Sequence, residues 1–209
     1  MRIQRLKVEI VTLKKSFVFD ENFYPGTNFV ESSTNTKGKS SAIAGIYYAL
    51  GFEQIIGEKK GVQVLSSAYK NIIKDEDDNN LNVLESKVFL ELEKDSDIIT
   101  ILRTGKSLSR KESLVSVYFS SLENIYKEDT KREDFFVHLP NSAKNQKGFH
   151  RFLEKFCGLN LPEVPTSDDS ERKLYLQILF SSMFIEQKRG WSDIFSSMPY
   201  LGIRDSKKE

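Results

Sequence analysis

The spacing of apolar residues changes abruptly at Gly38, and this change constrains the fold more than any other feature. Residues 2–10 and 16–23 alternate between apolar and polar side chains, which is typical of half-buried strands. A short run at 27–30 is expected to lead as a strand into a polar loop. After Gly38 the spacing becomes helical, with Gly51 as the expected C-cap, and the apolar positions are Ala42, Ile43, Ile46, Tyr47 and Leu50.

The rest of the chain alternates between strand-like and helical patterns. Residues 83–92 and 98–102 predict a hairpin, and 114–119 a further strand. Residues 127–134 form a charge cluster that predicts solvated loop. Helical spacing returns from residue 146, and a last helix is expected to begin near 168–170 and to continue to Met183.

Residues 33–40 (STNTKGKS) are close to the phosphate-binding pattern G-x-x-x-x-G-K-[ST]. In such a loop the backbone N–H groups surround phosphates, a Lys reaches the β and γ oxygens, and a hydroxyl binds Mg²⁺. The following helix points its positive end at the anion. Gly38, Lys39 and Ser40 fit this chemistry, whereas Ser33 stands where the pattern has Gly.

A second Gly-Lys-Ser at residues 105–107 serves as an internal control. It follows a strand-like run, but the polar segment after it has no helical spacing. We therefore predict a turn at a strand end there, and a phosphate-binding site only at the first copy.

The opening residues 3–8, the run 25–30 and Asn35 followed by Gly38-Lys39-Ser40-Ser41 resemble the N-terminal lobe of SMC, SbcC and RecF-type ATPases. The resemblance implies an α/β fold, that of a P-loop NTPase of the ABC-type head, with an antiparallel β subdomain. It implies one lobe over 1–209: strands, loop and helix over 1–52, the antiparallel subdomain over 83–120, and helices with the start of a coiled coil over 146–205. The implied ATP-binding residues are Asn35, Thr36, Lys37, Gly38, Lys39, Ser40 and Ser41. Thr36, like Ser33, stands where the family usually has Gly.

Gln187 precedes Lys188-Arg189-Gly190-Trp191, and it resembles the Q-loop glutamine of these ATPases. The resemblance implies that Gln187 takes part in catalysis and, with Ser40, in binding Mg²⁺. The segment 187–192 is also similar to SMC-like ATPases of bacterial anti-phage systems, the Lamassu type among them. A solvated glutamine at a helix end is the alternative for Gln187.

The sequence shows no LSGG-like signature, no apolar run ending in Asp-Glu and no switch histidine. The resemblance places these parts in a C-terminal lobe beyond a coiled coil, so the chain is expected to be one lobe of a longer protein. ATP hydrolysis is then expected only with that lobe and a second head, as a homodimer, coupling ATP to DNA clamping or release in DNA repair or antiviral defence. A nuclease or effector subunit is a further candidate partner.

Composition limits the remaining function classes. The formal net charge is +1, so any DNA-binding surface must be local, for example at residues 106–111 (KSLSRK). The single Cys157 and two His do not supply the ligands of a usual zinc site. The chain has no signal-like N-terminus and no long apolar stretch, which predicts a cytoplasmic protein without a membrane partner.

Two alternatives to an ATPase lobe stay open from the residues. One is a different P-loop enzyme, such as a small kinase or GTPase. The other is a nucleotide-binding scaffold that does not hydrolyse ATP and serves a nuclease partner, which Ser33 and Thr36 favour. His138 shows no Asp or Ser partner in the sequence that would indicate a catalytic triad.

Overall fold

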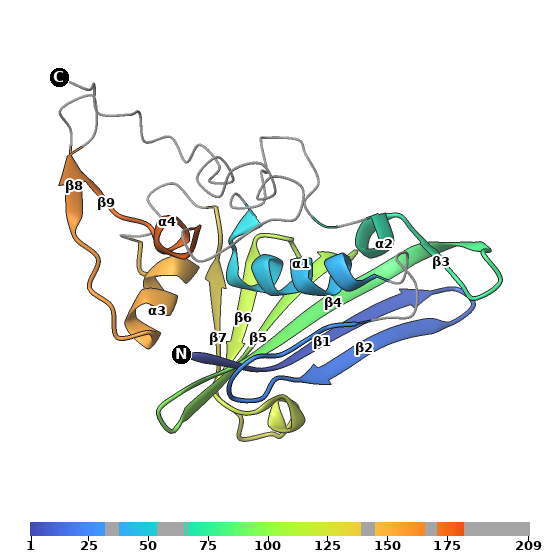
Figure 1. Cartoon of the computed structure of the whole chain (residues 1–209), viewed down its shortest axis with the longest axis horizontal. Coiled ribbons are helices and arrows are strands. Elements are labelled where there is room, and N and C mark those ends of the chain that lie inside the picture. The colour runs from blue at the N-terminus through green and yellow to red at the C-terminus, as the bar shows by residue number, and fades with distance from the viewer. Residues whose placement is uncertain (32–37, 54–64, 66, 139–144, 166–170, 182–209) are drawn as a thin grey trace.

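The protein is represented by a computed structural model that describes residues 1–31, 38–53, 65, 67–138, 145–165 and 171–181 (Figure 1). Its strands are β1 (Arg2–Thr12), β2 (Ser16–Asn22), β3 (Ile72–Lys74), β4 (Asn80–Lys94), β5 (Asp97–Lys106), β6 (Leu114–Tyr118), β7 (Arg132–Phe136), β8 (Glu163–Pro165) and β9 (Glu171–Lys173). Its helices are α1 (Lys39–Leu50), α2 (Ser67–Lys70), α3 (Phe149–Phe156) and α4 (Leu176–Ser181), with a 3₁₀ turn, η2, at Leu122–Asn124.

The main sheet has seven strands in the order β2-β1-β4-β5-β6-β7, with β3 paired to β4 beside this path. All of these pairs are antiparallel. Short connections explain why these neighbouring strands run in opposite directions. Residues 13–15 join β1 to β2, and Asp95 and Ser96 join β4 to β5. Loops of two or three residues can join only antiparallel neighbours.

The main core lies between the sheet and α1, which crosses one face of the sheet in Figure 1. Leu6, Leu90 and Ile101 lie opposite one another on three neighbouring strands, and they share this core with Ala49 of α1; all four are fully buried. Alternation along each strand places polar residues on the opposite face. A smaller apolar cluster lies there, formed by Phe89, Leu102, Tyr118, Leu122 and Ile125.

The expected α/β fold of a P-loop NTPase is wrong. The sheet is antiparallel, and the described helices are few and short, whereas that fold has a parallel sheet covered by helices. The strands predicted over 83–120 are antiparallel, and they belong to the same sheet as the N-terminal strands, since β4 pairs with β1 on one side and β5 on the other. The mixed sheet expected around the helix after the phosphate loop is instead antiparallel in every described pair of this sheet.

Several local predictions differ from the structure for physical reasons. Residues 27–30 are not a strand, and Phe29 is 88% exposed rather than buried against a sheet. The charge cluster at 127–134 contains the start of β7, whose Phe135 packs on Phe152 of α3 at 4.6 Å between ring centroids. The described part of the last predicted helix is α4, preceded by β9.

Gly51 ends α1 in a conformation that a side chain would not fit. Its φ is +73°, and its N–H donates to the carbonyl of Tyr48. A Cβ there would lie 2.7 Å from Val137 Cγ1 and 2.8 Å from His150 Nε2. Gly26 has a φ of +91° but open space around it.

We predict that Gly51→Ala lowers the free energy of unfolding by about 3 kcal/mol, because left-handed strain adds to overpacking. The matched control Gly26→Ala carries the strain alone and should cost about 1 kcal/mol. Urea unfolding of both variants measures the difference. Equal losses would show that α1 does not end against Val137 and His150 as described.

Candidate functional site

The N-terminus of α1 carries the described half of the predicted phosphate-binding loop. Gly38 immediately precedes the helix, and Lys39, Ser40 and Ser41 form its first turn. Gly38 and Ser40 are exposed, whereas Lys39 and Ser41 are half-buried. The loop residues Asn35, Thr36 and Lys37, and also Gln187, lie outside the described residues.

The backbone at this helix start fits an anion better than a side-chain cap. Gly38 has a φ of +78°, its carbonyl accepts the Ala42 N–H at 2.9 Å, and as a glycine it has no side chain with which to cap the helix. The N–H groups of a first helical turn have no carbonyl within their own helix to donate to. In α1 these groups, with the positive end of the helix dipole, form an arrangement that can bind a phosphate oxygen.

The second Gly-Lys-Ser lies at the end of a strand, as predicted. Lys106 is the last residue of β5 and pairs with Ser86 of β4. The next pair is Thr104 with Lys87, so the register shifts by one residue and Gly105 has no partner in the pairing between β4 and β5. Nearby, Arg110 donates to Ser116 Oγ at 2.9 Å, so part of the basic segment 106–111 is used within the sheet. No helix follows this copy, which separates the two occurrences.

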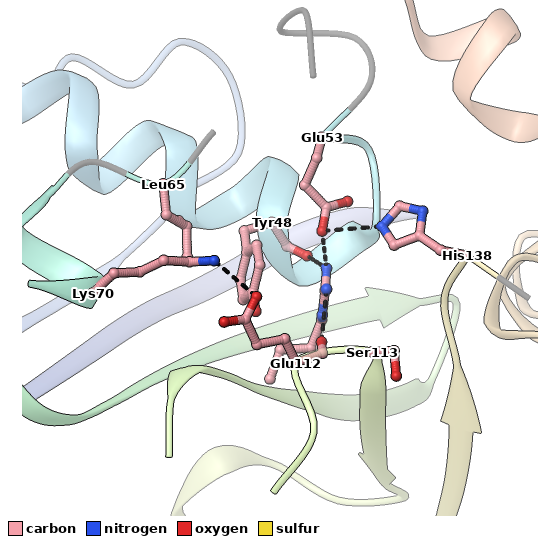
Figure 2. A pocket seen from close by; sticks show the side chains of 8 residues that line it. Tyr48, Glu53, Leu65, Lys70, Glu112, Ser113 and His138 are labelled. Atoms are coloured by element: carbon pink, nitrogen blue, oxygen red, sulfur yellow. Dashed lines mark hydrogen bonds and ion pairs between the residues drawn. The ribbon is translucent and has the colours of Figure 1, made fainter. Parts of the chain in front are cut away.

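A pocket of about 200 Å³ opens at the other end of α1 (Figure 2). The sequence did not indicate it, because its residues come from distant parts of the chain. They are Tyr48, Glu53, Leu65, Lys70, Arg103, Glu112, Ser113 and His138. Lys70 and Glu112 form an ion pair across it at 2.7 Å.

Arg103 of β5 is the central residue of this pocket and is only 1% exposed. Its Nη1 donates to the carbonyl of Tyr48 and, at 2.6 Å, to Glu53 Oε1, and its Nη2 donates to the carbonyl of Glu112 at 2.9 Å. The guanidinium also lies 3.8 Å from the centre of the Tyr48 ring. One side chain thus joins the end of α1, the residue after it and the segment before β6.

Glu53 is a buried carboxylate with an unusual set of neighbours. Burial alone would raise its pKa, but the charge of Arg103 and the nearby His138 outweigh this and hold the pKa below its ordinary value. His138 Nε2 lies 3.4 Å from Glu53 Oε1, and the His138 side chain is 38% exposed. Within the described part of the chain, the other carboxylate oxygen of Glu53 has no hydrogen-bond partner.

His150 of α3 completes the contacts at the end of α1. Its Nε2 lies 3.3 Å from the carbonyl of Leu50 and 3.1 Å from that of Gly51, so a proton on Nε2 is donated to both. Burial lowers the pKa of His150 to about 4, against the opposing charge of Glu53. His150 is therefore neutral at physiological pH.

His138 does have an acidic partner, Glu53, which sequence reasoning missed. Ser113 lines the same pocket, but Figure 2 shows its hydroxyl pointing away from His138, so the three do not form a nucleophilic triad. The usable signal was Arg103 itself. It follows Ile99 and Ile101 on the inward face of a strand. An arginine buried there is stable only when its charge is paired, so a buried carboxylate is expected beside it.

Among the described residues, no group of three or more His, Cys, Asp or Glu side chains is placed to hold a metal ion. The proposed Mg²⁺ ligands are Ser40, which is described, and Gln187, which is not. Because Ser40 is exposed at the helix start, its hydroxyl is accessible to an ion that arrives with a nucleotide.

We predict that Arg103→Met lowers the free energy of unfolding by about 3–5 kcal/mol, because Glu53 is left buried without its cation. The double variant Arg103→Met with Glu53→Leu should recover at least about 2 kcal/mol of this loss. Guanidinium unfolding measures both variants. Arg2→Met is the control, since Arg2 pairs with Glu93 at the same 2.6 Å but is partly exposed, and it should cost less than about 1 kcal/mol. If the losses of the single variants Arg103→Met and Glu53→Leu added up in the double variant, the proposed interaction between Arg103 and Glu53 would be contradicted.

We predict that His150 makes the protein less stable in mild acid. Its folded-state pKa lies below the unfolded value of about 6.5, so its contribution is complete above that pH and is lost as the pH falls towards 4. The loss should reach about 3 kcal/mol. His150→Gln keeps an N–H donor without a titrating ring and should flatten this slope. Urea unfolding between pH 7 and 4.5 measures how the free energy of unfolding changes with pH. The control is His138→Gln, at the other histidine of the chain. A slope that follows His138 instead would overturn the assignment.

Comparison with known proteins adds no relative from which a function could be transferred. No protein-family model matches the sequence. No curated protein matches it significantly either. In the part of the chain that the structure describes, no helix is long and apolar enough to cross a membrane.

Proposed function

We propose that this chain binds the phosphates of ATP at the N-terminus of α1. The observation that supports this most is the geometry of Gly38-Lys39-Ser40, where a left-handed glycine at the N-cap leads directly into a 12-residue helix. The Gly-Lys-Ser sequence and the helix that starts directly after it both fit a phosphate ligand.

Each residue of the proposed site has a separate role. The backbone amides at Gly38, Lys39 and Ser40 bind phosphate oxygens, and the Lys39 ammonium neutralises the β and γ phosphates. The Ser40 hydroxyl is the proposed ligand of the Mg²⁺ that accompanies ATP. Asn35, Thr36, Lys37 and Ser41 complete the loop in this proposal.

The wider proposal concerns the protein in which this lobe acts. On the strength of the resemblance over residues 1–52, we propose an SMC-like, DNA-associated ATPase. Hydrolysis would need a C-terminal lobe and a second head, with Gln187 coupling Mg²⁺ or water to head engagement. ATP would then drive clamping or release of DNA, in DNA repair or anti-phage defence. The antiparallel sheet does not support the α/β fold first expected, so this proposal rests on the loop and not on the fold.

The alternative is a scaffold that binds nucleotide without hydrolysing it and holds a nuclease partner. Ser33 and Thr36 favour this alternative, because each replaces a glycine whose lack of a side chain lets the backbone approach phosphate closely. Both residues lie outside the described residues. ATP turnover by the complete protein separates the two functions.

We predict saturable binding of a non-hydrolysable ATP analogue with Mg²⁺, measured by calorimetry on this chain. Lys39→Ala should weaken the binding at least about tenfold, because a charge-assisted contact to phosphate is worth about 1.5–3 kcal/mol.

Lys106→Ala is the matched control, since it removes the lysine of the second Gly-Lys-Ser and should leave the affinity unchanged. Equal effects of the two substitutions, or no binding by the unmodified chain, would contradict the proposed site. Far-UV circular dichroism of the variants checks that α1 still forms.

A further inference from the structure

The strand β2 lies at one edge of the sheet, and among the described strands its only neighbour is β1 (Figure 1). The Phe23 N–H donates to the Gln4 carbonyl at 2.7 Å, and the Thr12 N–H donates to the Lys15 carbonyl at 3.1 Å. Antiparallel strands direct alternate residues at a partner, so the odd-numbered residues of β2 bond to β1. The N–H and C=O groups that face outward belong to Ser16, Val18, Asp20 and Asn22.

This edge lacks two common protections against pairing with another strand. The register between β1 and β2 runs from Arg5 with Asn22 to Val11 with Ser16 without a bulge, and β2 contains no proline. Val18 is apolar and 59% exposed at the middle of the strand. Within the described part of the chain, the edge therefore offers backbone groups without a strand partner and an exposed apolar side chain at its centre.

A second copy of the chain can pair with this edge only in certain registers. In a two-fold antiparallel pair the outward-facing residues must meet each other, so an even-numbered residue lies opposite an even-numbered one. Pairing that places Val18 opposite Val18 of the second copy satisfies this condition. It also places Phe17 opposite Phe19 of the second copy.

The same register brings opposite charges together twice. Lys15 of each copy lies opposite Glu21 of the other, and both side chains are exposed in the single chain. Shifting the two-fold axis to Phe19 would instead place Val18 opposite Asp20, and Phe17 opposite Glu21. Of these two registers, charge and apolar matching both favour the one centred on Val18.

We propose that two copies of this chain associate through β2, with Val18 on the two-fold axis, so that their sheets join into one. This surface is distinct from the phosphate-binding end of α1, and the pairing does not require nucleotide. The interface is isologous, because each copy contributes the same strand.

Cysteine cross-linking tests the register directly. In a Cys157→Ser background, Val18→Cys should give a disulfide-linked dimer on mild oxidation, since paired Cα atoms lie about 5.5 Å apart. Asn22→Cys is the control. The two Asn22 residues would be separated by about 27 Å, which excludes a disulfide. Absence of the Val18 cross-link, or equal cross-linking at both positions, overturns the proposal.

Charge exchange tests the same interface in solution. Sedimentation of the unmodified chain should show a concentration-dependent dimer. Lys15→Glu should raise its dissociation constant about tenfold by removing both symmetric ion pairs, and adding Glu21→Lys should restore the dimer. A monomer at every concentration, or a dimer whose dissociation constant is unchanged by Lys15→Glu, would refute the pairing. Circular dichroism confirms that each variant keeps its sheet.

Discussion

The buried contact between Arg103 and Glu53 is the interaction on which the rest of this structure depends. A guanidinium inside an apolar core is destabilising unless its charge and its N–H groups find partners. The Nη1 and Nη2 groups of Arg103 find partners in the Tyr48 carbonyl, the Glu53 carboxylate and the Glu112 carbonyl, whereas its Nε has no hydrogen-bond partner among the described residues. The end of α1 and the segment before β6 are thereby fixed to the middle of the sheet.

This anchoring has a consequence for the opposite end of α1. Arg103 and His150 both donate to carbonyl groups at the C-terminal end of α1, where the helix dipole favours such donors. The middle of the helix packs closely on the sheet at Gly45, where a Cβ would lie 3.6 Å from Val8 Cγ2 and 3.6 Å from Val88 Cγ1. Because a helix is stiff along its axis, fixing its end and middle also fixes the place where Gly38 and Ser40 present their amides. One end of α1 thus anchors the helix, and the other end carries the proposed phosphate site.

Local patterns predicted local structure well here, and longer-range pairing poorly. Alternation identified β1, β2 and the β4–β5 hairpin, and helical spacing identified α1 with Gly51 as its cap. The fold class was wrong because a phosphate-binding motif does not specify strand direction, whereas short turns do. The strand β7 was not predicted, because charged residues make up much of it and Phe135 is its one buried residue. The proximity of Glu53, Arg103 and His138 could not be predicted from the sequence, because they lie in three distant segments that meet only after folding.

The most direct test of the account is a ¹⁵N NMR titration of this chain with Mg²⁺ and a non-hydrolysable ATP analogue. The account predicts saturable shifts at the amides of Gly38, Lys39, Ser40 and Ser41, with Gly105, Lys106 and Ser107 unchanged. Shifts of equal size at both Gly-Lys-Ser segments, or shifts centred on the pocket of Arg103 and His138, would contradict a phosphate-binding role for the start of α1.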